Sequence, residues 1–276
     1  MAGGIETAHD KLLYGAGEPP SVGFSGRLWG NMPVMRQKPM RNLILAAMMT
    51  VALAAGVVVA EVPSSVRSRS VIDQVAPGLK VALHEKGLTL GSPIFIRIFK
   101  ASRELEVWVE SGRRFELFKT YRICDYSGDF GPKLRTGDGQ SPEGFYFVPP
   151  DRMNPLSRFH LSFNLGFPNA YDRALGRTGS FLMVHGDCVS IGCYAMTDAG
   201  IEEIYTLADA ALRNGSPFFR VHVFPFRMTS ENLKAHRKSK WIEFWRNLKE
   251  GYDWFQEYRR PPNVEVAQGR YVFSAD

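Results

Sequence analysis

The chain lacks long blocks of lysine and arginine, although its formal net charge is +6. Because the positive charges are spread along the sequence, they do not form the concentrated basic stripe of a nucleic-acid-binding protein. A dispersed positive charge suits an anionic polymer or lipid surface of a cell envelope at least as well. We therefore expect no nucleic-acid partner.

The sequence also has no internal repeat, and its only irregular, glycine-rich stretch is the N-terminus. The chain has 276 residues and 45% hydrophobic content, enough to bury a core in one domain or in one domain with an extension. A wholly disordered chain is therefore excluded.

One long run without charge occurs at residues 43–60, LILAAMMTVALAAGVVVA. Basic residues precede it within residues 1–42, and this order predicts a signal peptide or a membrane anchor. Val58 and Ala60 offer small residues for a cleavage site, whereas the length also permits an uncleaved span with its basic flank in the cytoplasm. We expect export in both cases, and contact with a membrane only if residues 43–60 are uncleaved.

The first 34 residues make an unusual prelude to such a signal. Met32, Met35 or Met40 would each give a more ordinary start, so we hypothesise an internal N-terminus. N-terminal sequencing of the native protein tests this hypothesis.

Cysteine is scarce, with Cys124, Cys188 and Cys193 as the three members. In an exported protein, an odd number leaves at least one thiol outside intramolecular disulfides, and that thiol is a candidate reactive group. Two pairings are open. Cys124 and Cys188 can join and leave Cys193 free, or Cys188 can trap Cys193 in a regulatory disulfide.

Alternating apolar and polar residues after residue 90 predict a strand-rich globular part. The first three runs, separated by polar turns, predict a meander, and a strand ends beside His185. The predicted strands cover residues 94–99, 105–109, 115–123, 145–148, 159–165, 181–184 and 218–226.

Helical patterns flank and interrupt these strands. Residues 61–89 predict a linker with a short helix over 79–86, since Pro77 argues against a longer one. A helix is predicted from Thr197 as N-cap to Asn214. Residues 228–276 predict a helical extension, whose aromatic residues recur at three- and four-residue spacings and either pack onto the preceding domain or form a substrate or lid surface.

A candidate active site occupies residues 181–197, FLMVHGDCVSIGCYAMT. A cysteine attacks a carbonyl carbon only as the thiolate, and His185, eight residues before Cys193, can supply the base that this requires. Gly192 permits a tight turn with oxyanion-binding amides, and Ser190 can fasten that turn. The pattern predicts a cysteine nucleophile, with a buried structural thiol as the alternative.

A zinc site is the chemical alternative for the same stretch. His185, Cys188 and Cys193 would need a further ligand, for which His160 or Asp187 can be proposed. No second tight ligand pair accompanies them, so we expect neither a metal nor a cofactor.

A possible substrate-binding face lies on the predicted strand 159–165. His160, Ser162 and Asn164 alternate along it and would point the same way. We predict that His160 and Asn164 face the substrate, with a structural histidine as the alternative.

Three motifs in order resemble the L,D-transpeptidase catalytic domain of the YkuD type. They are GDGxxPxG ending at Gly144, then His185-Gly186, then SxGC ending at Cys193, and the resemblance covers residues 90–227. The longer string HGxCxSxGCYAMT, with PIFIRIFK and WxxFWxNLK, is similar to the YafK-like branch of exported murein enzymes.

This resemblance implies an α+β fold that is mainly β, with a helical C-terminal extension, and a peptidoglycan stem peptide as substrate. It also implies an acyl-enzyme, in which the thiolate takes the acyl part of an amide at a diaminopimelate residue. By position, Cys193 is the nucleophile, His185 the general base and acid, and the Gly186 carbonyl the group that orients the imidazole. The amides of Gly192 and Cys193 are oxyanion candidates.

The chain departs from the usual family pattern at Ile191, where other members carry a histidine. The acyl acceptor is therefore open: an amine, as in cross-linking, or water, as in an amidase that releases a peptide or a wall-attached protein. A noncatalytic peptidoglycan-binding domain is the hypothesis from another class. All three imply the periplasm, with the protein secreted or anchored by residues 43–60.

Overall fold

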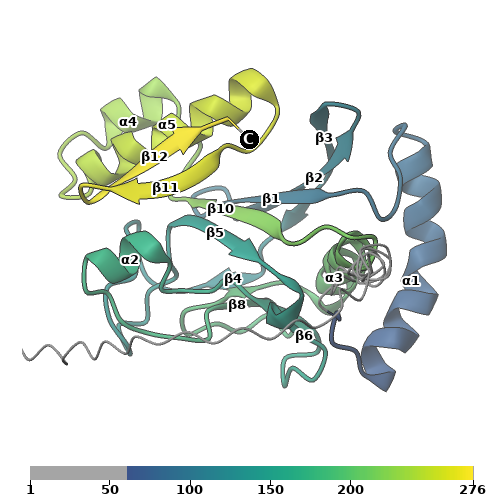
Figure 1. Ribbon diagram of the computed structural model, residues 1–276. Coiled ribbons are helices and arrows are strands. Elements are labelled where there is room, and N and C mark those ends of the chain that lie inside the picture. The colour runs from purple at the N-terminus through teal and green to yellow at the C-terminus, as the bar shows by residue number, and fades with distance from the viewer. Residues whose placement is uncertain (1–60, 276) are drawn as a thin grey trace, which may run out of the picture. The chain divides into compact units, whose positions relative to one another are not determined.

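The computed structural model describes residues 61–275, which form two five-stranded sheets, a C-terminal hairpin and several helices (Figure 1). The predicted segment 43–60 and the candidate starts lie outside these residues. Within residues 61–275, no helix is both long and apolar enough to cross a membrane. The predicted α+β class, built mainly on strand sheets, is confirmed.

The first sheet has the strand order β3-β2-β1-β10-β5. Its first three strands form the predicted antiparallel meander, and β10 pairs in parallel with β1. The strands are β1 (Ile94–Phe99), β2 (Glu104–Ser111), β3 (Arg114–Arg122), β5 (Gly144–Val148) and β10 (Phe219–Phe224).

Both faces of the first sheet are buried, which explains why all six residues of β1 are buried. One face, with Ile96 and Val221, belongs to the main hydrophobic core. The other face, with Phe99 and Phe224, packs against the C-terminal segment. The C-terminal segment is therefore part of the folded core rather than an appendage.

The second sheet has the order β4-β9-β8-β7-β6 and carries the predicted site at its centre. Its strands are β4 (Asp125–Tyr126), β6 (Met153–Asn154), β7 (Ser162–Asn164), β8 (Met183–His185) and β9 (Tyr194–Ala195). The predicted strands 159–165 and 181–184 are too long at their starts. His160 and Phe181 have left-handed backbones, with φ of 65° and 56°, which a strand does not accommodate.

The predicted short helix before the first sheet is wrong, because α1 spans Val66–His84 and contains Pro77. A proline inside a helix costs about 3 kcal/mol. Burial of Val71, Ile72, Leu79 and Leu83 returns roughly 1.5–3 kcal/mol for each side chain, which exceeds that cost. This buried face packs against α3 (Asp198–Arg213), beside which α1 runs in Figure 1.

The helix α3 confirms its predicted start and end. The Thr197 side chain accepts a hydrogen bond from the Gly200 amide at 3.1 Å, and Asn214 is the C-cap. The predicted apolar face is buried: Ile201, Ile204, Tyr205, Ala208, Ala211 and Leu212.

The C-terminal extension is only partly helical. It consists of α4 (Ser230–Ala235) and α5 (Ile242–Tyr258), followed by a hairpin of β11 (Asn263–Ala267) and β12 (Arg270–Ser274). Phe244, Trp245, Leu248, Tyr252 and Phe255 of α5 are buried. The spacing of these aromatic residues therefore reflects packing onto the first sheet. The two short helices α2 (Ala170–Ala174) and η1 (Pro150–Arg152) complete the described part of the chain.

Candidate active site

Cys193 lies directly before β9, beside the strand that ends in His185. In the parallel pair β8–β9, Val184 is opposite Tyr194. Since side chains alternate between the two faces of a sheet, Cys193 and His185 point to the same face. A hydrogen bond from the Met183 amide to Cys193 Sγ at 3.3 Å holds the thiol against β8.

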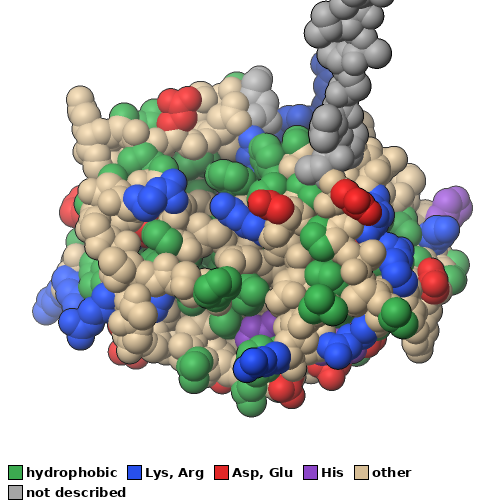
Figure 2. Space-filling view, turned by 60° about the horizontal axis from the view of Figure 1, so that its bottom comes forward, with side chains coloured by type: hydrophobic (Ala, Val, Ile, Leu, Met, Phe, Trp, Pro, Cys, Tyr) green, Lys and Arg blue, Asp and Glu red, His purple; other side chains and the backbone are tan. Residues whose placement is uncertain are grey.

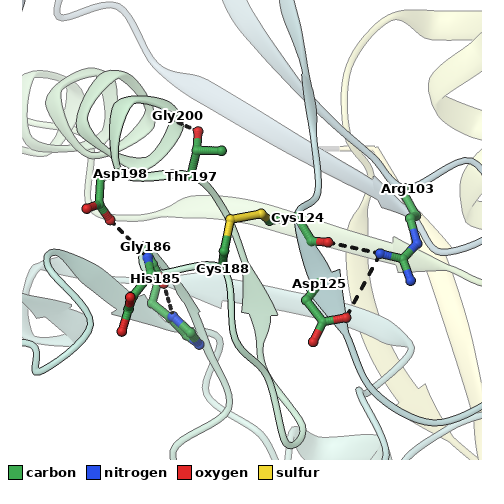
Figure 3. Close-up of a disulfide and its surroundings, with 10 residues drawn as sticks. Arg103, Cys124, Asp125, His185, Gly186, Cys188, Thr197, Asp198 and Gly200 are labelled. Atoms are coloured by element: carbon green, nitrogen blue, oxygen red, sulfur yellow. Dashed lines mark hydrogen bonds and ion pairs between the residues drawn. A yellow bond between two sulfur atoms is a disulfide. The ribbon is translucent and has the colours of Figure 1, made fainter.

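His185 is oriented by its own neighbour. Its Nδ1 lies 2.6 Å from the Gly186 carbonyl oxygen, as Figure 3 shows. Because a carbonyl oxygen only accepts hydrogen bonds, Nδ1 carries the proton and Nε2 keeps its lone pair. Phe159 covers the imidazole, with ring centroids 4.7 Å apart. The neutral imidazole therefore has a fixed tautomer and a basic nitrogen available for proton transfer.

Burial sets the resting protonation of both groups. It lowers the pKa of His185, against the opposing effects of the Gly186 carbonyl and Asp187. It raises the pKa of the Cys193 thiol, against the opposing effects of the Met183 amide and Lys133. The resting pair is accordingly a neutral imidazole and a protonated thiol, and the thiol must lose its proton as it attacks.

A side chain at position 186 would collide with the first turn of α3. A Cβ at this position would lie 2.4 Å from Asp198 Oδ1, which itself accepts a hydrogen bond from the Asp187 amide at 2.9 Å. Figure 3 shows Asp198 reaching from the start of α3 toward this loop. The first turn of α3 therefore holds the chain directly after His185.

Ser190 fastens the turn before Cys193 by two hydrogen bonds, as predicted from the sequence. Its Oγ donates to the Cys193 carbonyl at 2.8 Å and accepts from the Gly192 amide at 3.1 Å. Gly192 has φ of 145°, a backbone region that favours glycine. Because the Gly192 amide is committed to Ser190, the prediction that it binds an oxyanion is not supported by the resting geometry, and the Cys193 amide is the better candidate.

A disulfide joins Cys124 and Cys188, with Cα atoms 5.1 Å apart, and Cys193 is free. Of the two pairings left open by the sequence, the structure has the one that spares the candidate nucleophile. The bonded residues flank β9: the Cys124 amide donates to Ala195 O at 2.8 Å, and the Cys188 amide to Met196 O at 3.2 Å. Figure 3 shows this bridge tying the loop after His185 to the start of β4.

Replacement of Cys124 and Cys188 by serine is expected to lower the free energy of unfolding by about 4 kcal/mol. The physical reason is the 64-residue separation, which the disulfide closes in the unfolded chain. Urea denaturation of the double variant measures the loss, and Cys193→Ser, which leaves the disulfide intact, is the control. A loss equal to that of the control would contradict the prediction.

The alternative zinc site loses a ligand to the disulfide, because Cys188 has no thiolate to offer. Among residues 61–275, no group of three or more His, Cys, Asp and Glu side chains is arranged to hold a metal ion. The geometry around Cys193 thus favours thiol chemistry over a metal centre.

The predicted substrate-binding residues have partners inside the protein. His160 Nε2 lies 2.8 Å from Glu202 Oε1 of α3, and its left-handed backbone removes it from the alternation of β7. Asn164 Oδ1 accepts the Gly166 amide at 2.8 Å. Asn164 is opposite Met183 in the β7–β8 register and so shares the face of Cys193. The substrate role of both residues stays a prediction.

Exposed apolar side chains surround the site. The exposed fractions are 73% for Phe181, 53% for Val189 and 92% for Ile191, which stands where the family usually has a histidine. Figure 2 shows a face on which hydrophobic side chains lie among basic and acidic ones, with a histidine partly visible between them. Ile191 itself points into solvent and offers the site no proton acceptor.

The contact between the loop of residues 127–143 and Cys193 was not predicted from the sequence. Ser141 Oγ donates to the Cys193 carbonyl at 3.1 Å, beside the bond from Ser190. Lys133 is buried and ion-paired with Asp138. Burial, the larger effect, raises the pKa of the Cys193 thiol, and the Lys133 charge acts to lower it. The GDGxxPxG motif begins in this loop, but no sequence signal placed the loop against Cys193.

Comparison with known proteins gives one strong likeness. The chain is 51% identical over 194 residues to "Putative L,D-transpeptidase YafK" of Escherichia coli (strain K12), covering 70% of this chain and 79% of the relative. A scan against protein-family models finds no match.

Two solved structures show weaker likenesses. The helical cell shape determining protein Pgp2 from Campylobacter jejuni has a TM-score of 0.39 and 16% identity, covering 68% of this chain and 79% of Pgp2. Bd1075 of Bdellovibrio bacteriovorus has a TM-score of 0.38 and 18% identity, covering 64% of this chain and 78% of Bd1075.

Sequence identity over most of the chain shows the family. The contact of His185 with Gly186 O and the pairing of β8 with β9, which follows Cys193, agree with the family motifs found in the sequence. This chain belongs to the YafK-type branch of the L,D-transpeptidase family.

Proposed function

We propose that the protein is a peptidoglycan-modifying cysteine acyltransferase that forms an acyl-enzyme on Cys193 with a diaminopimelate-containing stem peptide. The observation that carries the proposal is the shared face of Cys193 and His185, with His185 Nδ1 donating to Gly186 O and Nε2 left basic. A surface or core histidine would not need this orientation beside a free thiol.

In the first half-reaction, His185 Nε2 takes the thiol proton as Cys193 Sγ attacks the carbonyl carbon of the amide. The carbon–nitrogen bond breaks, and the imidazolium returns the proton to the leaving amine. The developing oxyanion would accept a hydrogen bond from the Cys193 amide, whose peptide unit lies between the Gly192 amide and the Cys193 carbonyl that Ser190 holds.

In the second half-reaction, an amine or water attacks the thioester carbonyl carbon while His185 Nε2 takes its proton. The carbon–sulfur bond then breaks, the new amide or carboxylic acid leaves, and the imidazolium returns the proton to Cys193 Sγ. Water is the second candidate acceptor because the site lies at the surface, beside the exposed Ile191 and Phe181. With water, the protein would be an amidase that releases a peptide or a wall-attached protein.

The periplasm is the proposed location. The disulfide between Cys124 and Cys188 supports an oxidising compartment, because such bonds rarely persist in the cytosol. The family's relation to the cell wall supports the same location, and peptidoglycan stem peptides are the proposed partners.

Mass spectrometry of both the protein and the muropeptides, after their incubation together, tests the proposal. We expect a covalent mass increase on Cys193, followed by new cross-linked products when an amine donor is present, or by shortened products when water is the acceptor. Binding of muropeptides with neither adduct nor product would favour the noncatalytic peptidoglycan-binding domain instead.

A further inference from the structure

A buried ion pair lies behind the loop that contacts the nucleophile. Lys100, directly after β1, and Glu143, directly before β5, are both fully buried, with Nζ and Oε1 3.0 Å apart. Lys100 Nζ also donates to the Ser141 carbonyl at 2.7 Å and to the Gly131 carbonyl at 3.0 Å. The Lys100 ammonium group therefore binds two carbonyls, ten residues apart, within the loop of residues 127–143.

Glu143 continues the network to the C-terminal segment. Its Oε1 accepts the Gly131 amide at 2.7 Å, and its Oε2 accepts Trp245 Nε1 of α5 at 2.9 Å. Trp245 is 2% exposed. The loop is thus tied to a helix more than one hundred residues later in the chain.

The same loop reaches Cys193 in two ways. Ser141, whose carbonyl Lys100 holds, donates its hydroxyl to the Cys193 carbonyl at 3.1 Å. The next residue along the site strand, Tyr194, donates its hydroxyl to Pro142 O at 2.7 Å. The position of the peptide unit after the nucleophile therefore depends on the loop that Lys100 and Glu143 hold.

We propose that Lys100, Glu143 and Trp245 are positioning residues for Cys193, so that α5 is a working part of the active site. This inference rests on the proposed function in assigning Cys193 as the nucleophile. A buried ion pair gives little net stability but accepts few alternative geometries when its hydrogen bonds are all made. Displacement of a nucleophile by about 1 Å can cost about a hundredfold in rate.

A matched control exists on the same sheet. Arg97 and Glu106, on β1 and β2, form a second buried ion pair, at 2.7 Å, and Trp108 Nε1 donates to Glu106 at 2.9 Å. Both triads thus combine a cation, a glutamate and an indole. The Glu106 triad extends to Arg227 rather than to the loop that contacts Cys193.

The experiment compares Glu143→Gln with Glu106→Gln in the full chain. We expect both to lower the melting temperature, because each leaves a buried cation without its counterion. Only Glu143→Gln is expected to slow the alkylation of Cys193 by iodoacetamide, by about tenfold or more, and to move the pH midpoint of that reaction. Similar rates and midpoints in the two variants would overturn the proposal.

Trp245→Phe and Trp108→Phe decide the matter if Glu143→Gln does not fold, since each removes one hydrogen bond to a glutamate and keeps a ring. Slower alkylation only in Trp245→Phe supports the positioning role, and equal rates refute it. Iodoacetamide needs no murein substrate, so these outcomes are independent of whether the protein acts on peptidoglycan.

Discussion

Replacement of Cys193 by alanine is expected to abolish turnover of muropeptides, with a fall of about a millionfold toward the uncatalysed rate. In the proposed mechanism, the thiol both forms the covalent bond and supplies the proton that the leaving amine finally receives. His185 and the turn around Ser190 would remain in place but would have no nucleophile to activate.

The measurement is product formation from purified stem peptides, together with the intact mass of the protein. Thermal stability should change little, because the thiol accepts one hydrogen bond from the Met183 amide, makes only a long one of 3.7 Å to the Phe181 carbonyl, and stays partly exposed. Cys193→Ser is a second arm, since its hydroxyl fits the site but ionises far less readily. Full activity in the alanine variant would refute the cysteine mechanism.

Replacement of His185 by alanine is expected to slow acylation by about 10²–10⁴-fold, the usual contribution of a general base. Burial raises the pKa of Cys193, so little thiolate forms at neutral pH without the imidazole. Pre-steady-state formation of the acyl-enzyme measures the effect. His84→Ala, at the exposed end of α1, is the control. A loss of melting temperature without a change in acylation would assign His185 a structural role.

The pH dependence of acylation follows from the same two groups. His185 acts as a base only when it is neutral, and burial places its pKa below the ordinary value of 6.5. Acylation should therefore persist as the pH falls to about 6.5 and decline only below it, as the imidazole becomes protonated. His185→Ala should lose this acidic limb and gain rate only as the pH rises toward the raised pKa of the thiol. A rate that is already maximal at pH 5 would instead indicate a resting thiolate.

Local sequence predicted the parts of the site that are close together in the chain. His185, Gly186, Ser190 and Cys193 lie within nine residues, and several of their hydrogen bonds join members of this short segment. The helix α3 was predictable for a similar reason, because its N-cap and its apolar spacing are local signals.

Predictions failed where a distant contact overrode a local preference. Pro77 lies inside α1 because the burial of apolar residues against α3 outweighs the cost of the proline. The strand predicted over 159–165 is shortened by the left-handed backbone of His160, whose ring meets Glu202 on α3. The helix predicted through residue 276 gives way to a hairpin over residues 263–274, because the aromatic spacing that indicated a helix extends only to Phe255.

The sequence by itself determined the local elements of the candidate site: a thiol, a histidine eight residues before it and a glycine turn, in an order that matches one family. Only the tertiary structure decided which thiols pair, which amide near Cys193 is bonded to Ser190, and how Lys100, Glu143 and Trp245 are joined behind the loop that contacts Cys193. The physical reason is distance along the chain. A residue's chemical type and its near neighbours are written in the sequence, whereas partners 64 or 102 residues apart meet only when the sheets and α5 pack together.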